Sequence, residues 1–264
     1  MADAVLAGQP IHYADTGGNG QALVFSHAFG MNGTMFAPQI VAFGDRYRCV
    51  TWNARGYQGS PASQPFDFWD SARDLIGLLD HIAIDRAVLV GTSQGGFAAM
   101  RAALAAPDRV AGLVVLGSSA AAEAPDQRVA FRQMMDAFIA DPVAGPPEAV
   151  LDGMAHVCLG AHDATNWKEI WRDWPAEQAD RALTALIDRD DIVARLGEVK
   201  APALVMHGSD DQSYAPGLGR QIADGLADCR GFEVVEGGAH FLSLTDAAPV
   251  NAAMARFLDA IGWR

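Results

Sequence analysis

Residues 88–100 read VLVGTSQGGFAAM, in which an apolar run leads into a serine flanked by glycines and then into small residues. The first half is typical of a buried strand and the second half of a helix. A chain that turns so sharply from strand to helix has no room for side chains beside the turn, and Gly91 and Gly95 provide that room. This G-x-S-x-G pattern predicts that Ser93 is a nucleophile rather than its alternative, a helix-capping serine.

A serine hydroxyl needs a base and a group that orients the base. Candidates for both follow short apolar runs late in the chain: HGSDDQ at 207–212 contains Asp210 and Asp211, and GGAH at 237–240 ends in His240. Because the carboxyl ends of parallel strands meet at one edge of a sheet, these residues can reach the serine. The order Ser, Asp, His therefore predicts a catalytic triad of Ser93, His240 and one of the two aspartates.

A tetrahedral intermediate of acyl transfer also needs N–H donors for its negative oxygen. The backbone N–H of Gln94, directly after the serine, is one candidate. The loop SHAFGMN at 26–32 follows an early apolar run and supplies the other. We favour the N–H of Phe29 there, with that of Ala28 as the alternative, and we interpret His27 as a structural hydrogen-bonding residue.

Short apolar runs alternate with helix-like segments along most of the chain, which predicts a doubly wound, mostly parallel α/β sheet. The runs lie at 11–15, 22–27, 48–52, 87–91, 111–117, 202–208 and 232–237. Among the helix-like segments, FDFWDSARDLIGLLDHI at 66–82 has apolar residues at helical spacing. Asp67 or Asp70 is expected to cap its start.

Residues 123–196 interrupt this alternation, because they contain helix-like pieces separated by proline and glycine and no convincing strand. We interpret them as a helical cap inserted between two strands, over a pocket. The core domain is then 1–122 together with 197–264.

Tryptophan and methionine in this insertion are candidates for the walls of an apolar pocket. The candidates are Trp167, Trp171, Met135 and Met154. Trp167, Trp171 and Trp174 share one helical face, so a packed stripe inside the cap is the alternative for the tryptophans. Met134 is considered together with the other two methionines.

Charged and metal-binding side chains are considered for other sites. Four arginines could bind a substrate carboxylate, although a solvated arginine is the favoured interpretation of each. They are Arg55, Arg128, Arg132 and Arg172. His156, Cys158, His162 and Asp163 have a spacing that does not suit one helical face, so we predict no metal. We find no phosphate-loop or dinucleotide motif.

Nineteen basic against thirty-two acidic residues give a net charge of −13. Such a surface repels nucleic acid and anionic membranes. Solubility is the favoured reason for the acidity, and a preference for neutral or cationic substrates is the alternative. The absence of a long apolar run argues against a membrane span, and the first ten residues do not resemble a signal peptide. Cys49, Cys158 and Cys229 are few and distant, which favours reduced thiols in the cytoplasm.

Taken together, five segments resemble the α/β-hydrolase superfamily over nearly the whole chain. They are HAFG (27–30), WNARGYQGS (52–60), GTSQGG (91–96), HGSDDQ (207–212) and GGAH (237–240). The second segment usually reads D-x-R-G-x-G-x-S in that family, whereas Asn53 replaces the aspartate here. The chain is most similar to the capped esterase and lactonase group that includes 3-oxoadipate enol-lactonases.

The resemblance implies an α/β-hydrolase fold and hydrolysis of a small-molecule ester or lactone through an acyl-serine, without a cofactor. The family's spacing favours Asp211 over Asp210. Hydrolysis of a C–C bond in a diketone-type ring-cleavage product and a perhydrolase or non-haem haloperoxidase activity are alternatives, as is a ligand-binding protein on a hydrolase scaffold. Ser93 argues against the dehalogenase and epoxide hydrolase groups, which have aspartate at this turn. Assembly into a homo-oligomer stays open.

Overall fold

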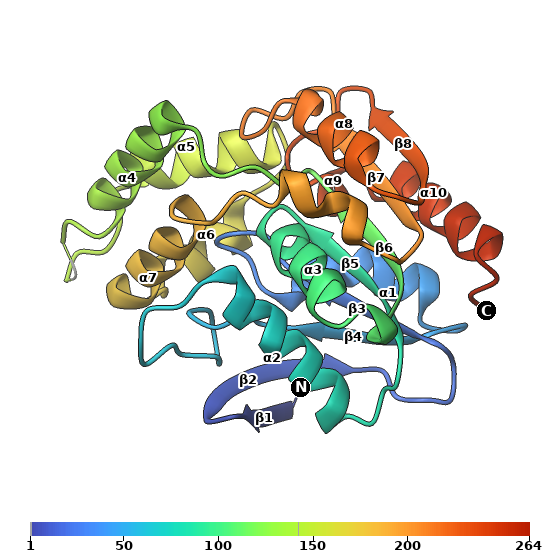
Figure 1. Ribbon diagram of the computed structural model, residues 1–264. Coiled ribbons are helices and arrows are strands. Elements are labelled where there is room, and N and C mark those ends of the chain that lie inside the picture. Colours follow the sequence, from blue (N-terminus) through green and yellow to red (C-terminus); the bar gives the residue numbers. More distant parts are fainter. Residues whose placement is uncertain (1, 142) are drawn as a thin grey trace.

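The computed structural model describes residues 2–141 and 143–264 (Figure 1). Its centre is one sheet of eight strands in the order β1-β2-β4-β3-β5-β6-β7-β8. The strands are β1 (Ala2–Leu6), β2 (Gln9–Asp15), β3 (Ala22–Ser26), β4 (Arg48–Trp52), β5 (Ala87–Thr92), β6 (Val110–Leu116), β7 (Ala203–Gly208) and β8 (Cys229–Val235). β1 and β2 are antiparallel to each other, β2 is antiparallel to β4, and the pairs from β4 to β8 are parallel.

Strand β1 is missing from the seven predicted runs. It is an edge strand in which only Ala4 and Leu6 are buried, and the exposed Val5 between them removes the alternation of apolar and polar residues that would mark a half-buried strand. It pairs with β2 through a tight turn at Ala7 and Gly8, both with positive φ. Alanine rarely adopts that conformation, and the sequence therefore carries only a weak hairpin signal. The other seven strands overlap the predicted runs, and the prediction of a mostly parallel sheet is confirmed.

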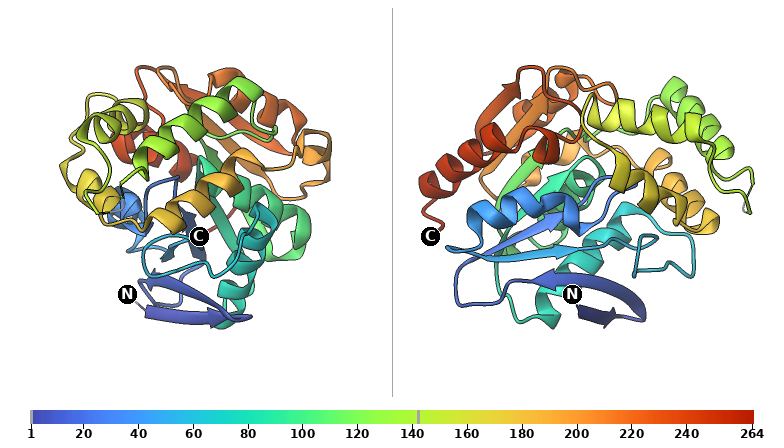
Figure 2. Two further views of the ribbon diagram at one scale, coloured as in Figure 1. Left: turned by 90° about the vertical axis from the view of Figure 1, so that its left-hand side faces the viewer. Right: turned by 180° about the vertical axis from the view of Figure 1, so that it is seen from behind.

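Helices cover both faces of the sheet. The core helices are α1 (Ala37–Phe43), α2 (Phe68–His81), α3 (Gln94–Ala105), α8 (Pro216–Gly225), α9 (Leu242–Thr245) and α10 (Ala247–Ala260), with short 3₁₀ turns at η1 (Gly33–Phe36) and η2 (Pro107–Arg109). Figure 1 shows α2, α3 and α8 in front of the sheet, and the view from behind in Figure 2 shows α1 and α10 on the other face. Asp67 caps α2 in a reciprocal pair with Asp70, so both predicted capping residues take part.

Between β6 and β7 the chain leaves the sheet and forms four helices at one end of it (Figure 1). They are α4 (Pro125–Phe138), α5 (Glu148–Leu159), α6 (Thr165–Arg172) and α7 (Ala176–Ile187), followed by the 3₁₀ turn η3 (Val193–Glu198). The interval 123–196 thus holds helices and no strand in its described part, 123–141 and 143–196. Within the described residues, none of the helices combines the length and apolarity needed to cross a membrane.

Candidate active site

Ser93 lies in the turn between β5 and α3 with a φ of 54° and a ψ of −118°. This backbone conformation is unusual for a residue with a side chain, so surrounding contacts must hold it. The N–H of Ser93 donates to the carbonyl of Leu116, and the hydroxyl of Ser118 donates to the carbonyl of Ser93, both at 2.8 Å. A Cβ on Gly95 would lie 1.9 Å from the carbonyl oxygen of Ser26, and one on Gly91 would lie 2.3 Å from that of Gly95. The glycines therefore permit the close approach that the turn requires.

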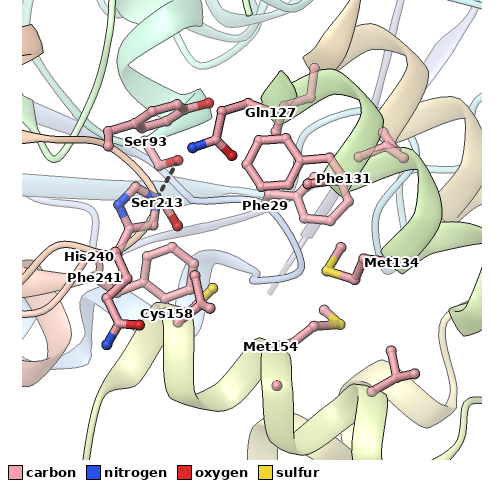
Figure 3. Close-up of a pocket in the computed structure, with 18 of the residues that line it drawn as sticks. Phe29, Ser93, Gln127, Phe131, Met134, Met154, Cys158, Ser213, His240 and Phe241 are labelled. Carbon is pink, nitrogen blue, oxygen red and sulfur yellow. Dashed lines mark hydrogen bonds between the residues drawn. The ribbon is translucent and has the colours of Figure 1, made fainter. Parts of the chain in front are cut away.

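The structure brings Ser93, His240 and Asp211 together in one chain of contacts. His240 Nε2 lies 3.0 Å from Ser93 Oγ, as drawn in Figure 3, and His240 Nδ1 lies 2.7 Å from Asp211 Oδ2. Asp210 is exposed and accepts a hydrogen bond from the hydroxyl of Ser209 instead. The imidazole is thus held between a hydroxyl and a buried carboxylate, which is the arrangement that general-base activation of a serine requires.

The carboxylate of Asp211 is held by several donors. Its Oδ1 accepts the N–H groups of Ser213 and Tyr214 at 2.8 and 2.9 Å. Burial by itself would raise the pKa of Asp211, but His240, His207 and the N–H of Tyr214 outweigh it and hold that pKa well below its usual range. Asp211 is therefore ionised and can stabilise a positive charge on His240.

His207 was not among the predicted site residues. It is fully buried at the end of β7, where its Nε2 lies 3.0 Å from Asp211 Oδ2 and 2.9 Å from the carbonyl of Tyr214. The sequence HGSDDQ at 207–212 shows that His207 directly precedes the loop that contains Asp211. The sequence could not tell on which face of the strand the ring would lie, because strand side chains alternate between faces.

The two predicted N–H donors belong to Gln94, at the turn after Ser93, and to Phe29, in the loop after β3. Gln94 is the first residue of α3, and the first N–H groups of a helix have no acceptor within it. Phe29 lines the same cavity as Ser93. The N–H of Ala28, the alternative to that of Phe29, points to Met35 Sδ at 3.3 Å. The N–H of Ala28 therefore already has an acceptor within the protein, which leaves the N–H of Phe29 as the candidate for a second donor.

His27 has the structural role predicted for it. Its Nδ1 lies 2.8 Å from the carbonyl of Ala28, and its Nε2 accepts the N–H of Ala54 at 2.9 Å. Burial lowers the pKa of His27 to about 4, so the ring is neutral and joins two loops near the site.

A cavity of about 440 Å³ opens beside Ser93 and His240, between the core and the helices α4, α5 and α7 (Figure 3). Met154, a predicted wall residue, lines it, and so does Met134. Cys158 also lines it, and burial together with the nearby Asp211 carboxylate raises the pKa of this thiol to about 12. Cys158 is therefore a neutral wall group.

Three predicted wall residues lie elsewhere. The Trp171 ring is fully buried, and its Nε1 donates to the carbonyl of Gly30 at 2.6 Å, so it joins helix α6 to the loop after β3. Met135 is fully buried, and Trp167 packs against the hydrophobic core. Helical spacing shows which residues share a face, but it does not show which face meets the cavity.

All four candidate arginines pair with carboxylates. Arg55 contacts Asp74 at 2.7 Å, Arg128 contacts Asp188 at 2.5 Å, and Arg132 contacts Asp136 at 2.8 Å; Arg172 pairs with Glu148. In the described part of the chain, none of the four lines the cavity. Those residues also contain no cluster of three His, Cys, Asp or Glu side chains placed to hold a metal ion.

Comparison with known proteins agrees with this geometry. Residues 21–247 match the family described as "alpha/beta hydrolase fold". The chain belongs to this family. It is 30% identical to a candidate carbamate hydrolase, RutD, of Variovorax paradoxus (strain S110), over 96% of this chain and 97% of the relative. It is 31% identical to a 2-hydroxy-6-oxononadienedioate/2-hydroxy-6-oxononatrienedioate hydrolase of Burkholderia vietnamiensis, over 80% and 78% of the two chains.

Among solved structures, the enol-lactonase of Burkholderia xenovorans LB400 has the same fold, with a TM-score of 0.86 and 23% identity over 98% of this chain and 100% of that one. The predicted membership of the α/β-hydrolase superfamily is therefore confirmed, with relatives of the esterase and lactonase kind. The fold and the relatives named as hydrolases support a hydrolase.

This α/β-hydrolase carries Asn53 where the family's usual motif has aspartate. Asn53 Oδ1 accepts the N–H of Gly33 at 2.9 Å, and its Nδ2 donates to the carbonyl of Gln58 at 2.7 Å. An ionised aspartate could accept the first bond but could not donate the second. The amide therefore joins two loops of this chain by a pair of bonds that aspartate cannot reproduce.

Proposed function

We propose that this protein hydrolyses a small carboxylic ester or lactone through an acyl intermediate on Ser93. His240 Nε2 takes the proton from Ser93 Oγ as that oxygen attacks the carbonyl carbon. Asp211 keeps the imidazole oriented and stabilises its positive charge. The N–H groups of Phe29 and Gln94 hold the negative oxygen of the tetrahedral intermediate.

The ester C–O bond then breaks, and His240 returns its proton to the departing alcohol oxygen. Water enters and gives a proton to His240 while its oxygen attacks the acyl carbon. The second tetrahedral intermediate collapses, the acid leaves, and the proton returns to Ser93 Oγ. None of these steps uses a cofactor. The helices α4–α7 serve in this proposal as the cap over the cavity.

One observation carries this proposal: Ser93 Oγ lies 3.0 Å from an imidazole nitrogen whose ring contacts Asp211 at 2.7 Å, beside an apolar cavity. Replacing Ser93 by alanine should lower kcat on a p-nitrophenyl ester by roughly 10⁵-fold or more. Ser63, which is exposed and does not line the cavity, offers the matched Ser63→Ala control, which should keep wild-type turnover. Retained turnover in a folded Ser93→Ala protein would contradict the proposal.

A carbamate is the second candidate, since the candidate carbamate hydrolase relative aligns over 96% of this chain. The same attack by Ser93 on a carbonyl would apply. A p-nitrophenyl N-alkylcarbamate separates the two: a carbamate hydrolase turns it over repeatedly, whereas an esterase stops after one equivalent of nitrophenol per Ser93. Hydrolysis of a C–C bond is disfavoured, because the arginines that could bind an acidic diketone are paired elsewhere.

A further inference from the structure

The cavity beside Ser93 has two chemically different ends. Figure 3 shows Gln127 and Ser213 near the Ser93–His240 pair, while Met134 and Met154 lie toward the opposite end. The end away from the serine carries the thioethers of Met134 and Met154. The hydrocarbon side chains of Phe131, Val150, Leu183 and Leu186 also line the cavity. Contact between such a wall and a hydrocarbon chain lowers the free energy of binding, because both lose contact with water. The wall provides no hydrogen bond or opposite charge to a charged group.

Both arginines of helix α4, which lines the cavity, are already paired with carboxylates. Arg132, on α4, contacts both Asp136 and Asp180, and Arg128 contacts Asp188. A substrate carboxylate placed at the end away from the serine would lose its water and find no cation among the described lining residues. The net charge of −13 further disfavours the approach of an anion.

A cationic group would fare no better at this end, because the lining residues in the described part of the chain include no aspartate or glutamate. His240 is the titratable group of the wall that takes part in the reaction, and it lies at the other end. The apolar end therefore suits the uncharged part of a substrate.

At the serine end, Gln127 brings a neutral amide from helix α4. Figure 3 shows its amide group directed toward Ser93. No hydrogen-bond partner for this amide is found among residues 2–141 and 143–264. An amide that loses water when substrate binds needs a partner on the substrate, and it can both donate and accept.

We propose that this cavity selects an uncharged substrate. A hydrocarbon chain of the substrate packs against the Met134–Met154 end, and a neutral group near the reacting carbonyl forms a hydrogen bond with the Gln127 amide. The inference rests on the proposed function and narrows its substrate class. It separates this chain from the relative whose name specifies a dioate, a substrate with two carboxylates.

Three p-nitrophenyl esters of similar chain length test the charge selection: heptanoate, monoadipate with a terminal carboxylate, and 6-(trimethylammonio)hexanoate. We expect kcat/KM for heptanoate to exceed the values for both charged esters by about 100-fold or more, since burial of an unpaired charge is unfavourable. A charged ester cleaved as well as heptanoate would overturn the inference and leave the proposed function standing.

A charge introduced at the apolar end makes the test sharper. Met134 is half-buried, so the guanidinium of a Met134→Arg variant can reach the cavity without full burial. The ratio of monoadipate to heptanoate kcat/KM should rise about tenfold or more in this variant. The Met134→Gln variant, similar in length and uncharged, is the matched control and should not raise that ratio. An equal rise in both variants would contradict the charge argument.

The role of Gln127 is tested with a substrate pair, p-nitrophenyl 3-hydroxyheptanoate and heptanoate. The Gln127→Leu variant removes the amide at similar volume and should lower the ratio of their kcat/KM values by about tenfold. Gln127→Asn should keep part of the ratio because it keeps an amide. A ratio unchanged in Gln127→Leu would show that Gln127 does not read the substrate.

Binding to a Ser93→Ala protein separates failure of the inference from failure of the proposed function. Calorimetry should show dimethyl adipate binding at least tenfold more tightly than monomethyl adipate, whether or not esters are turned over. Neutral ligands bound selectively without any ester turnover in the wild type would keep the charge selection and refute the ester hydrolysis. Tighter binding of the carboxylate would refute the charge selection.

Discussion

Arg189 Nη1 lies 2.6 Å from Glu123 Oε2, and this buried ion pair joins the segment that enters helices α4–α7 to the segment that leaves them. The hydroxyl of Tyr214 donates to the same Glu123 oxygen at 2.9 Å. The Arg189 guanidinium also lies 4.3 Å from the centre of the Phe97 ring, on the helix that starts after Ser93. The two segments that flank helices α4–α7 are thus connected to the loop that carries Asp211 and to the helix that starts after Ser93.

Removing one partner of this pair should destabilise the fold strongly. The Arg189→Met variant leaves the Glu123 carboxylate buried without its cation, which typically lowers the free energy of unfolding by about 3–5 kcal/mol. Urea denaturation measures the change. Arg256→Met, which breaks an exposed pair with Glu233, is the control and should change stability by less than about 1 kcal/mol. The double variant Arg189→Met/Glu123→Gln should recover much of the loss, and no recovery would show that the charge is not its cause.

The two neighbouring aspartates should differ sharply in their effect on turnover. Asp211→Asn keeps the shape of the acid but lets the amide favour the wrong imidazole tautomer, so kcat should fall by about 10⁴-fold, as in other serine triads. Asp210→Asn changes an exposed residue and should leave kcat within about twofold of the wild type. Steady-state kinetics on one p-nitrophenyl ester compares them. A larger loss of kcat in Asp210→Asn than in Asp211→Asn would contradict the choice of Asp211 as the residue that orients His240.

Buried His27 should make the stability depend on pH. Its pKa falls from 6.5 to about 4 on folding, so the unfolded chain binds a proton more readily than the folded one. The stability contributed by its neutral form is therefore complete above about pH 6.5 and is lost as the pH falls toward about 4, by about 3 kcal/mol in total.

A His27→Gln variant isolates this contribution, because glutamine keeps an acceptor for the Ala54 N–H but does not titrate. The difference in unfolding free energy between wild type and variant, measured in urea, should shrink by about 3 kcal/mol from about pH 7.5 to about pH 4. A difference that stays constant over this range would mean that the His27 pKa is not lowered in the fold.

The turn at Ser93 should not tolerate a methyl group on Gly95, because the added Cβ would lie 1.9 Å from the Ser26 carbonyl oxygen. Gly95→Ala should therefore lower the Tm by at least about 4 °C, or prevent folding. Gly217, on α8, is the matched control, since a Cβ there meets nothing within 4 Å. Gly217→Ala should leave the Tm unchanged or raise it. Equal Tm values for both variants would contradict the close approach at Gly95.

Much of the fold could be predicted because its signals are local. Val88–Val90 and the glycines around Ser93 specify a strand, a turn and a helix within thirteen residues. β1 escaped prediction because its burial is limited to Ala4 and Leu6 and its turn uses an alanine with positive φ. Its strand is defined by pairing with β2 rather than by its own pattern.

Some residues of the candidate site could likewise be predicted from local sequence, and others could not. Ser93, Asp211 and His240 were predicted from three separate segments, since each follows a strand and the carboxyl ends of parallel strands share one edge. His207 and Gln127 were not predicted, because nothing in their local sequence shows what their side chains face.

The sequence by itself determined the order in which Ser93, Asp211 and His240 follow their strands, the glycine-flanked turn at Ser93, and the excess of acidic over basic residues. Only the tertiary structure decided that Met134 and not Met135 meets the cavity, that the arginines of helix α4 are already paired, and that Trp171 joins helix α6 to the loop at Gly30. The physical reason is that backbone turns and strand burial depend on neighbouring residues, whereas the walls of a cavity depend on how separate helices rotate and pack against one another.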